Sequence, residues 1–206
     1  MSTDSARDGA AAARNLAEAL RALGVEPVGP HLAETPARVV ELWGELFAAH
    51  GTPVTLPDDS TFANPDPGAG LVLAADLPFY AMCAHHLLPF FGRAHVAFLP
   101  GARMVGFGAL ARLVDVASRR PTLQEDLAAS VATAIERGLV PRGVAVLVTA
   151  RHLCMEMRGV RRRARMETLE WRGAFQEDEA RRVEFLARVA RPVRGPRIAP
   201  GRGGHP

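Results

Sequence analysis

Residues 71–86, Leu-Val-Leu-Ala-Ala-Asp-Leu-Pro-Phe-Tyr-Ala-Met-Cys-Ala-His-His, join an apolar segment to a group of metal-ligand residues. The part up to Tyr80 predicts a β-strand that leads into Cys83-Ala84-His85-His86. The second of the two cysteines lies in His152-Leu153-Cys154. Residues two apart in an extended segment point the same way, so we expect His152 and Cys154 to face one pocket.

These residue types favour a zinc site. Cys83, His86 and Cys154 would supply three soft or borderline ligands and leave a fourth position open, as in catalytic zinc sites. His85 and His152 would then remain free to transfer protons beside the metal. The alternatives are a disulfide between the two cysteines, or cysteines that act as small buried hydrophobes. The grouping of four ligand-type residues in two short segments favours zinc.

Length and composition indicate one domain, or one subunit of an assembly. The chain has 206 residues, of which 48% are hydrophobic and 23% charged, as is usual for a soluble globular protein. It contains neither an apolar run long enough to span a bilayer nor a signal-peptide core. We therefore expect a cytoplasmic protein with reduced cysteines and no membrane partner.

The positive charge is concentrated at the C-terminus. Residues 190–206 hold four arginines and no acid, and without them 21 basic residues face 22 acidic ones. Because this segment is also rich in Pro and Gly, residues 191–206 are predicted to form a disordered, solvated tail. Weak contact of the tail with nucleic acid or another anion is the alternative, and the domain itself is not expected to bind nucleic acid. The chain has no lysine, so arginine or backbone amides must make any phosphate contact.

Residues 1–10 are expected to be disordered, and 11–70 to form a helical region followed by a linker. Helices are predicted over 11–23 and from Thr35, whose hydroxyl would cap the second helix. An apolar stripe marks that second helix: Val39, Trp43, Leu46 and Phe47. Residues 53–70 are rich in Pro, Asp and Gly and are predicted to contain no strand.

Residues 71–190 are predicted to form the catalytic domain, with an α+β fold. The expected strands cover 71–80, 93–99, 143–149 and 166–171, and the expected helices 109–117, 123–137 and 177–190. Ala94, Val96 and Phe98 would share one face of their strand, and His95 would lie on the other without a functional role. This order of elements predicts a largely antiparallel four-stranded sheet. Its open edges predict closure by association of subunits.

Four motifs together resemble the GTP cyclohydrolase I family. They are Cys83-x-His85-His86-x-x-Pro89-Phe90, the run 106–120, Arg120-Pro121-x-x-Gln124-Glu125, and His152-x-Cys154-x-x-x-Arg158-Gly159. The resemblance covers about 35–186 with the motifs in order. It implies a tunnelling fold (T-fold), an antiparallel sheet with helices on one face, which closes into a barrel by oligomerisation. Two barrels would stack into a decamer with sites at subunit interfaces.

The resemblance also implies a reaction. Zinc is expected on Cys83, His86 and Cys154, and its bound water would attack C8 of GTP. Formate would leave, and the sugar would rearrange and reclose to give 7,8-dihydroneopterin triphosphate. His85 would protonate N7, and His152 would make a second proton transfer.

The same resemblance implies the substrate contacts. Glu125 would accept hydrogen bonds from N1–H and the 2-amino group of guanine, with Gln124 beside it as a second substrate-binding residue. The alternative for Glu125 is a capping box with Thr122 at a helix start. Three arginines match the triphosphate contacts: Arg38 from a neighbouring subunit, Arg112 and Arg158.

Three positions depart from the family pattern. Ala84 replaces a glutamate, Gly108-Ala109 replaces a Ser-Lys pair used for triphosphate binding and ring closure, and 160–167 replaces a Ser/Thr-rich segment. We therefore expect formate release to be better preserved than pterin formation. Two other functions stay open: a purine-nucleotide hydrolase that stops at a ring-opened pyrimidine or prefers another phosphorylation state, and a non-catalytic zinc-stabilised assembly subunit.

Overall fold

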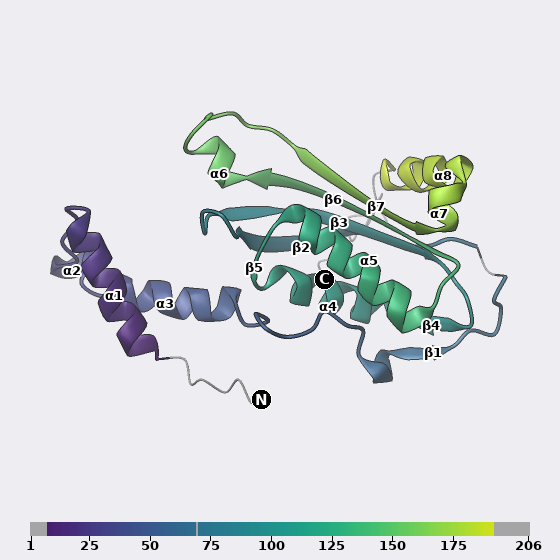
Figure 1. The fold of residues 1–206 in the computed structure, drawn as a ribbon, viewed down its shortest axis with the longest axis horizontal. Helices are drawn as coiled ribbons and strands as arrows, with labels where there is room; N and C mark the ends of the chain where they lie inside the picture. The colour runs from purple at the N-terminus through teal and green to yellow at the C-terminus, as the bar shows by residue number, and fades with distance from the viewer. Residues whose placement is uncertain (1–7, 69, 192–206) are drawn as a thin grey trace, which may run out of the picture.

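The computed structural model describes residues 8–68 and 70–191, and it has an α+β fold built on one five-stranded sheet. The strand order is β5-β2-β3-β6-β7 (Figure 1). The four long strands are antiparallel to their neighbours: β2 Val72–Cys83, β3 Pro89–Leu99, β6 Gly143–His152 and β7 Met166–Gly173. The fifth strand, β5 (Pro121–Thr122), is parallel to β2 and was not predicted.

Two long helices cover one face of the sheet. α4 (Phe107–Ser118) and α5 (Gln124–Leu139) pack against it and enclose the main core. The predicted alternation in β3 is confirmed, because Ala94, Val96 and Phe98 all belong to this core and are at most 1% exposed.

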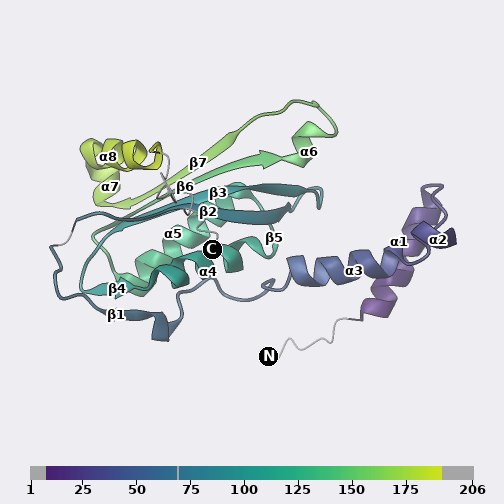
Figure 2. The ribbon, with the colours of Figure 1, turned by 180° about the vertical axis from the view of Figure 1, so that it is seen from behind.

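The T-fold prediction required helices on one face of the sheet only, and the structure differs on this point. α7 (Ala174–Glu177) and α8 (Glu179–Val189) lie on the opposite side of the sheet from α4 and α5 (Figures 1 and 2). There Phe175 and Phe185 pack on Leu99 and Leu147 in a second apolar cluster. The helix predicted over 177–190 is confirmed as α8, whereas the short helix α7 before it was not predicted.

The N-terminal helices extend beyond the other end of the sheet. α1 (Gly9–Ala22), α2 (Gly29–Leu32) and α3 (Thr35–Leu46) lie together, away from α4 and α5 (Figure 2). Helix α1 begins inside the segment that was expected to be disordered. Thr35 does not cap α3, because it lies inside the helix and its hydroxyl donates to the carbonyl of His31.

The connection from α3 to β2 is more ordered than predicted. It contains a 3₁₀ turn, η1 (Asp58–Ser60), and a short strand, β1 (Thr61–Ala63), which pairs with β4 (Arg103–Val105). Polar residues and prolines concealed this three-residue strand. The predicted disordered tail lies outside the described residues, apart from Arg191.

His95 is buried on the α7–α8 side of the sheet and has a structural role. Its Nδ1 accepts a hydrogen bond from the backbone amide of Asp76 at 3.2 Å, where the β2–β3 register shifts between Ala74 and Leu77. Burial lowers the pKa of His95, against an opposing effect of Asp76. In the part of the chain that the structure describes, no helix is both long and apolar enough to cross a membrane.

Candidate active site

Most of the predicted site residues meet at the end of the sheet that carries the β2–β3 turn, β5 and the short helix α6 (Leu153–Glu156), which Figure 1 labels. A cavity of about 320 Å³ lies there. It is lined by Cys83, His85, His86, Phe90, Thr122, Leu123, Gln124, Glu125, His152 and Cys154. Seven of the ten predicted site residues therefore line one cavity, and Arg38, Arg112 and Arg158 do not.

The turn after β2 presents the first three of these residues. Cys83 ends the strand, and its carbonyl accepts hydrogen bonds from the amides of His86 and Leu87. Leu87 has a φ of 49°, a left-handed conformation that strains a residue with a Cβ. This tight turn places both histidine side chains close to the Cys83 thiol.

The donor atoms of the turn have the spacing of a metal site. Ligand atoms of Cys83, His85 and His86 lie within 4.8 Å of one another, and Cys83 Sγ is 3.8 Å from His86 Nδ1. Two such ligands on one tetrahedral zinc are about 3.5 Å apart, given Zn–S of about 2.3 Å and Zn–N of about 2.0 Å. The donor set and its spacing therefore fit zinc without a large rearrangement.

Cys154 approaches the same cavity from α6 and not from an extended segment, so the predicted strand geometry for His152 and Cys154 is wrong. β6 ends at His152, and Cys154 lies in the first turn of the helix. Both cysteines are free thiols. Burial, with Cys83 as the next cause, raises the pKa of the Cys154 thiol. The raised pKa favours the protonated thiol, whereas a bound metal cation would favour the deprotonated form, because metals bind the thiolate.

An ion pair anchors the helix that carries Cys154. Arg151 Nε donates to Glu156 Oε1 at 2.9 Å, and this hydrogen bond lowers the pKa of Glu156. The Arg151 guanidinium also lies 5.7 Å from the centre of the Phe91 ring. This side-chain pair thus joins β6, which precedes Cys154, to α6, which contains it.

His152 is held on two sides. Its ring stacks on Phe90, with centroids 4.7 Å apart and planes 5° from parallel, and the two residues are direct partners in the β3–β6 register. Its Nε2 lies 2.8 Å from Gln124 Oε1. Burial lowers the pKa of His152, with Glu125 acting in the opposite direction.

Glu125 is exposed on the cavity side of the first turn of α5. The capping-box alternative is wrong, because Leu123 is the N-cap residue and Thr122 lies in β5 with its hydroxyl directed to the Leu123 carbonyl. Within the described residues, the Glu125 carboxylate has no hydrogen bond or ion pair. It remains available to a ligand.

The three predicted arginines differ in how close they lie to the cavity. Arg158 Nη2 is 3.2 Å from Nε2 of His86, at the rim of the cavity. Arg38 is on α3 and forms an exposed ion pair with Glu34. Arg112 is exposed on α4. Neither Arg38 nor Arg112 lines the cavity of its own chain.

Sequence reasoning gave no role to Phe90 and did not foresee the buried contacts of Gln124. Phe90 is fully buried and forms one wall of the cavity. The motif around it contained the signal, since an aromatic residue seven positions after Cys83 returns to the site along the next strand of a hairpin. Gln124 is only 3% exposed and faces the sheet.

Comparison with known proteins settles the family. A family model described as GTP cyclohydrolase I matches residues 12–190. The chain belongs to the GTP cyclohydrolase I family.

Three curated relatives share the name GTP cyclohydrolase 1. The Deinococcus radiodurans protein is 42% identical over 86% of this chain and 82% of its own length. The Lactiplantibacillus plantarum protein is 43% identical over 84% of this chain and 92% of its own length. The Streptococcus thermophilus protein is 45% identical over 82% and 90%, respectively.

Proposed function

We propose that this chain is a zinc-dependent GTP cyclohydrolase that converts GTP into formate and 7,8-dihydroneopterin triphosphate. One observation carries the proposal: a single cavity gathers two cysteines, three histidines and a carboxylate free of described partners. Membership of the GTP cyclohydrolase I family supplies the reaction class.

Cys83, His86 and Cys154 would hold the zinc. Cys83 and His86 have the required donor spacing, and Cys154 lines the same cavity. A zinc ion at such a site supplies Lewis acidity and lowers the pKa of a water molecule that it binds. Zinc binding needs reduced thiols, which supports a cytoplasmic location.

The protein groups divide the remaining work. Glu125 would accept hydrogen bonds from N1–H and the 2-amino group of guanine, which orients the purine and rejects bases that lack these donors. His85 is exposed on the turn and would donate a proton to N7 as C8 is hydrolysed. His152, on the opposite wall, would carry the second proton transfer.

The triphosphate would be bound by arginines from two chains. Arg158 is already at the rim of the cavity, whereas Arg38 and Arg112 lie outside it. We propose that the subunits close into a T-fold barrel, and that two barrels form a decamer in which Arg38 reaches a neighbouring cavity. The exposed Arg38 on a projecting helix supports this arrangement.

One observation favours a second candidate, a hydrolase that releases formate but stops at a ring-opened pyrimidine. Gly108 is exposed, and a Cβ there would lie at an ordinary 3.5 Å from Arg112 Nη1, so a serine would fit. Ala109 is 1% exposed in the main core, so a lysine at this position would have to extend out of the core to reach a phosphate. The phosphate contact and hydroxyl that usually assist ring closure are therefore both replaced.

The deciding experiment incubates zinc-loaded protein with GTP and measures formate and pterin fluorescence separately, with zinc content from elemental analysis. The proposal predicts about one zinc per chain and pterin as well as formate, with the pterin yield at or below the formate yield, and Cys154→Ser should lose both zinc and activity. Formate without pterin would select the second candidate. A zinc-loaded protein that releases no formate would leave the non-catalytic assembly subunit.

A further inference from the structure

Gln124 is enclosed by partners for every polar atom of its amide. Its Nε2 lies 3.0 Å from the Val148 carbonyl, 3.3 Å from the Met166 carbonyl and 3.1 Å from Thr168 Oγ1. Its Oε1 faces His152 Nε2 at 2.8 Å. The side chain is 3% exposed, its amide nitrogen is fully committed to the protein, and only the second lone pair of Oε1 is left over, so it has no donor to offer a purine.

The chemistry of these partners fixes which end of the amide faces His152. The two carbonyls can only accept hydrogen bonds, so the amide nitrogen must point to β6 and β7. The oxygen must then point to His152, and an amide oxygen can only accept. His152 Nε2 therefore carries the hydrogen, and in the neutral ring the free lone pair lies on Nδ1.

Phe90 restricts the rotation of the His152 ring that the hydrogen bond to Gln124 alone would allow. One hydrogen bond would still let the imidazole swing about the Nε2–Oε1 line. The near-parallel stack on the fully buried Phe90 ring fixes the plane. Tautomer, plane and distance are thus set by two residues that the cavity wall holds rigidly.

We infer that Gln124 is a positioning residue, which locks His152 in its Nε2–H tautomer with Nδ1 as the proton acceptor, and that it does not contact the substrate base. The inference rests on the proposed function for the role of His152. Recognition of the base is left to Glu125 and nearby backbone groups.

The kinetic test compares Gln124→Met with Thr168→Val. The methionine variant fills the same space but cannot hold the imidazole, whereas the valine variant removes another amide contact and leaves His152 untouched. We expect Gln124→Met to lower kcat for formate release by about ten- to a hundredfold with KM for GTP within about twofold. Thr168→Val should change kcat by less than about threefold, and Gln124→Glu, which keeps an acceptor towards His152, should recover part of the loss.

A spectroscopic measurement separates this inference from the proposed function. Solid-state ¹⁵N spectra of histidine-labelled zinc protein report the tautomer without any turnover, and the His152 signals are those missing in His152→Asn. The expected result is a protonated Nε2 and an unprotonated Nδ1 in neutral His152 of the wild type, and a mixture of tautomers in Gln124→Met. An Nδ1–H tautomer in the wild type, a rise in KM with unchanged kcat in Gln124→Met, or an equal kcat loss in Thr168→Val would each overturn it.

Discussion

Adjacent residues at the start of α5 serve opposite sides of the site. Gln124 is buried against the sheet, Glu125 opens onto the cavity, and Asp126 lines a different cavity beside Arg120. The two acids both lie in the first turn and both favour the helix dipole. They therefore form a matched pair in which only one has access to a bound purine.

Glu125→Ala should abolish discrimination between guanine nucleotides and purine nucleotides that lack the 2-amino group. The reason is that the guanine 2-amino group would lose the carboxylate that accepts its hydrogen bond. Asp126→Ala removes the same helix-start charge and should leave this discrimination intact. The measurement is the ratio of kcat/KM for GTP and ITP in each variant, with zinc content as a check on folding. Equal behaviour of the two variants would mean that Glu125 acts through the helix and not through the base.

His95 makes a prediction for stability against pH. Burial lowers its folded-state pKa below the ordinary value of 6.5, so the unfolded chain binds the proton first. The contribution of neutral His95 is fully present above pH 6.5 and is lost as the pH falls towards the folded-state value. We expect urea unfolding to show a steeper loss of stability as the pH falls below about 6.5 in the wild type than in His95→Gln. Parallel curves for the two proteins would contradict this assignment.

At the scale of single residues, the sequence predicted which residues share a chemical role better than it predicted the contacts around each of them. Cys83, His86 and His152 could be grouped because metal and acid–base chemistry restricts residue type and spacing. The position of Gln124 could not be predicted, since its partners at Val148 and Thr168 are brought to it by strands far along the chain.

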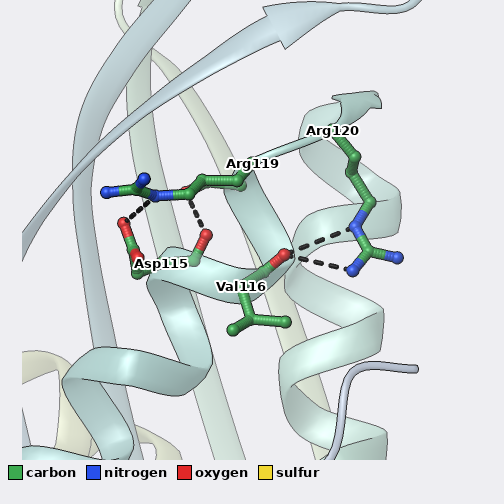
Figure 3. A network of polar contacts seen from close by, with 5 residues as sticks. Asp115, Val116, Arg119 and Arg120 are labelled. Carbon is green, nitrogen blue, oxygen red and sulfur yellow. Dashed lines mark hydrogen bonds and ion pairs between the residues drawn. The ribbon is translucent and has the colours of Figure 1, made fainter. Parts of the chain in front are cut away.

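At the scale of elements, two arginines at the end of α4 show how a helix end holds a distant segment. Arg119 Nε donates to Asp115 in its own helix at 2.9 Å (Figure 3). The backbone carbonyl of Arg119 also accepts a hydrogen bond from Ala49 N. Arg120 bonds the Val116 carbonyl through Nε and Nη2, as Figure 3 shows, and its Nη2 also donates to the Thr52 carbonyl at 2.8 Å. The Arg120 side chain thus ties the connection after α3 to the body.

Arg120→Met should release that connection, because methionine keeps the apolar stem but cannot donate to Thr52. Hydrogen exchange of the segment after α3 should become faster, and the unfolding free energy should fall by about 1 kcal/mol. The control is Arg119→Met, which loses only a bond within α4 and keeps its backbone carbonyl. If the two variants exchange alike in this segment, the guanidinium of Arg120 is not the tie.

Element types were largely predictable, and short elements were not. The strands and helices of the core have clear periodicity, and their alternation gave the faces of β3 correctly. β1, β4 and β5 span only two or three residues each and depend on pairing with distant strands. The turn to α6 after His152 was missed because four residues are too few to show a helical period.

At the scale of the whole molecule, the N-terminal helices have little to pack against within one chain. α1 has no buried residue, and in α3 only Pro36 is buried. The two helices border an apolar cavity of about 570 Å³ that reaches Trp43 and Phe47. The apolar stripe of α3, to which Trp43 and Phe47 belong, needs a partner surface, which supports assembly of subunits.

Trp43→Glu should therefore weaken the proposed decamer, because a charge would be buried wherever this stripe meets a neighbour. Light scattering should give a mass ten times that of the chain for the wild type and a smaller mass for the variant. Glu41→Gln, a change at a neighbouring α3 residue bordering the same cavity, should retain the wild-type mass. A monomeric wild type would remove the basis for shared sites.

A shared site makes a sharper prediction about Arg38. Among the described residues of its own chain, Arg38 pairs only with Glu34 on an exposed helix, so we expect its guanidinium to reach the triphosphate in a neighbouring subunit. Arg38→Ala should then weaken GTP binding by about ten- to a hundredfold, the loss of one charge-assisted contact. His152→Ala should abolish turnover.

Co-expression of these two variants in equal amounts tests where Arg38 acts. A working cavity needs His152 from one chain and Arg38 from its neighbour, so random mixing should restore about a quarter of the wild-type activity at low GTP. Mixing His152→Ala with Glu125→Ala provides the control, because both residues line the same cavity of one chain and no mixed assembly can complete it. Recovery in the first mixture but not in the second would place Arg38 across the interface, whereas no recovery in either would return it to its own chain.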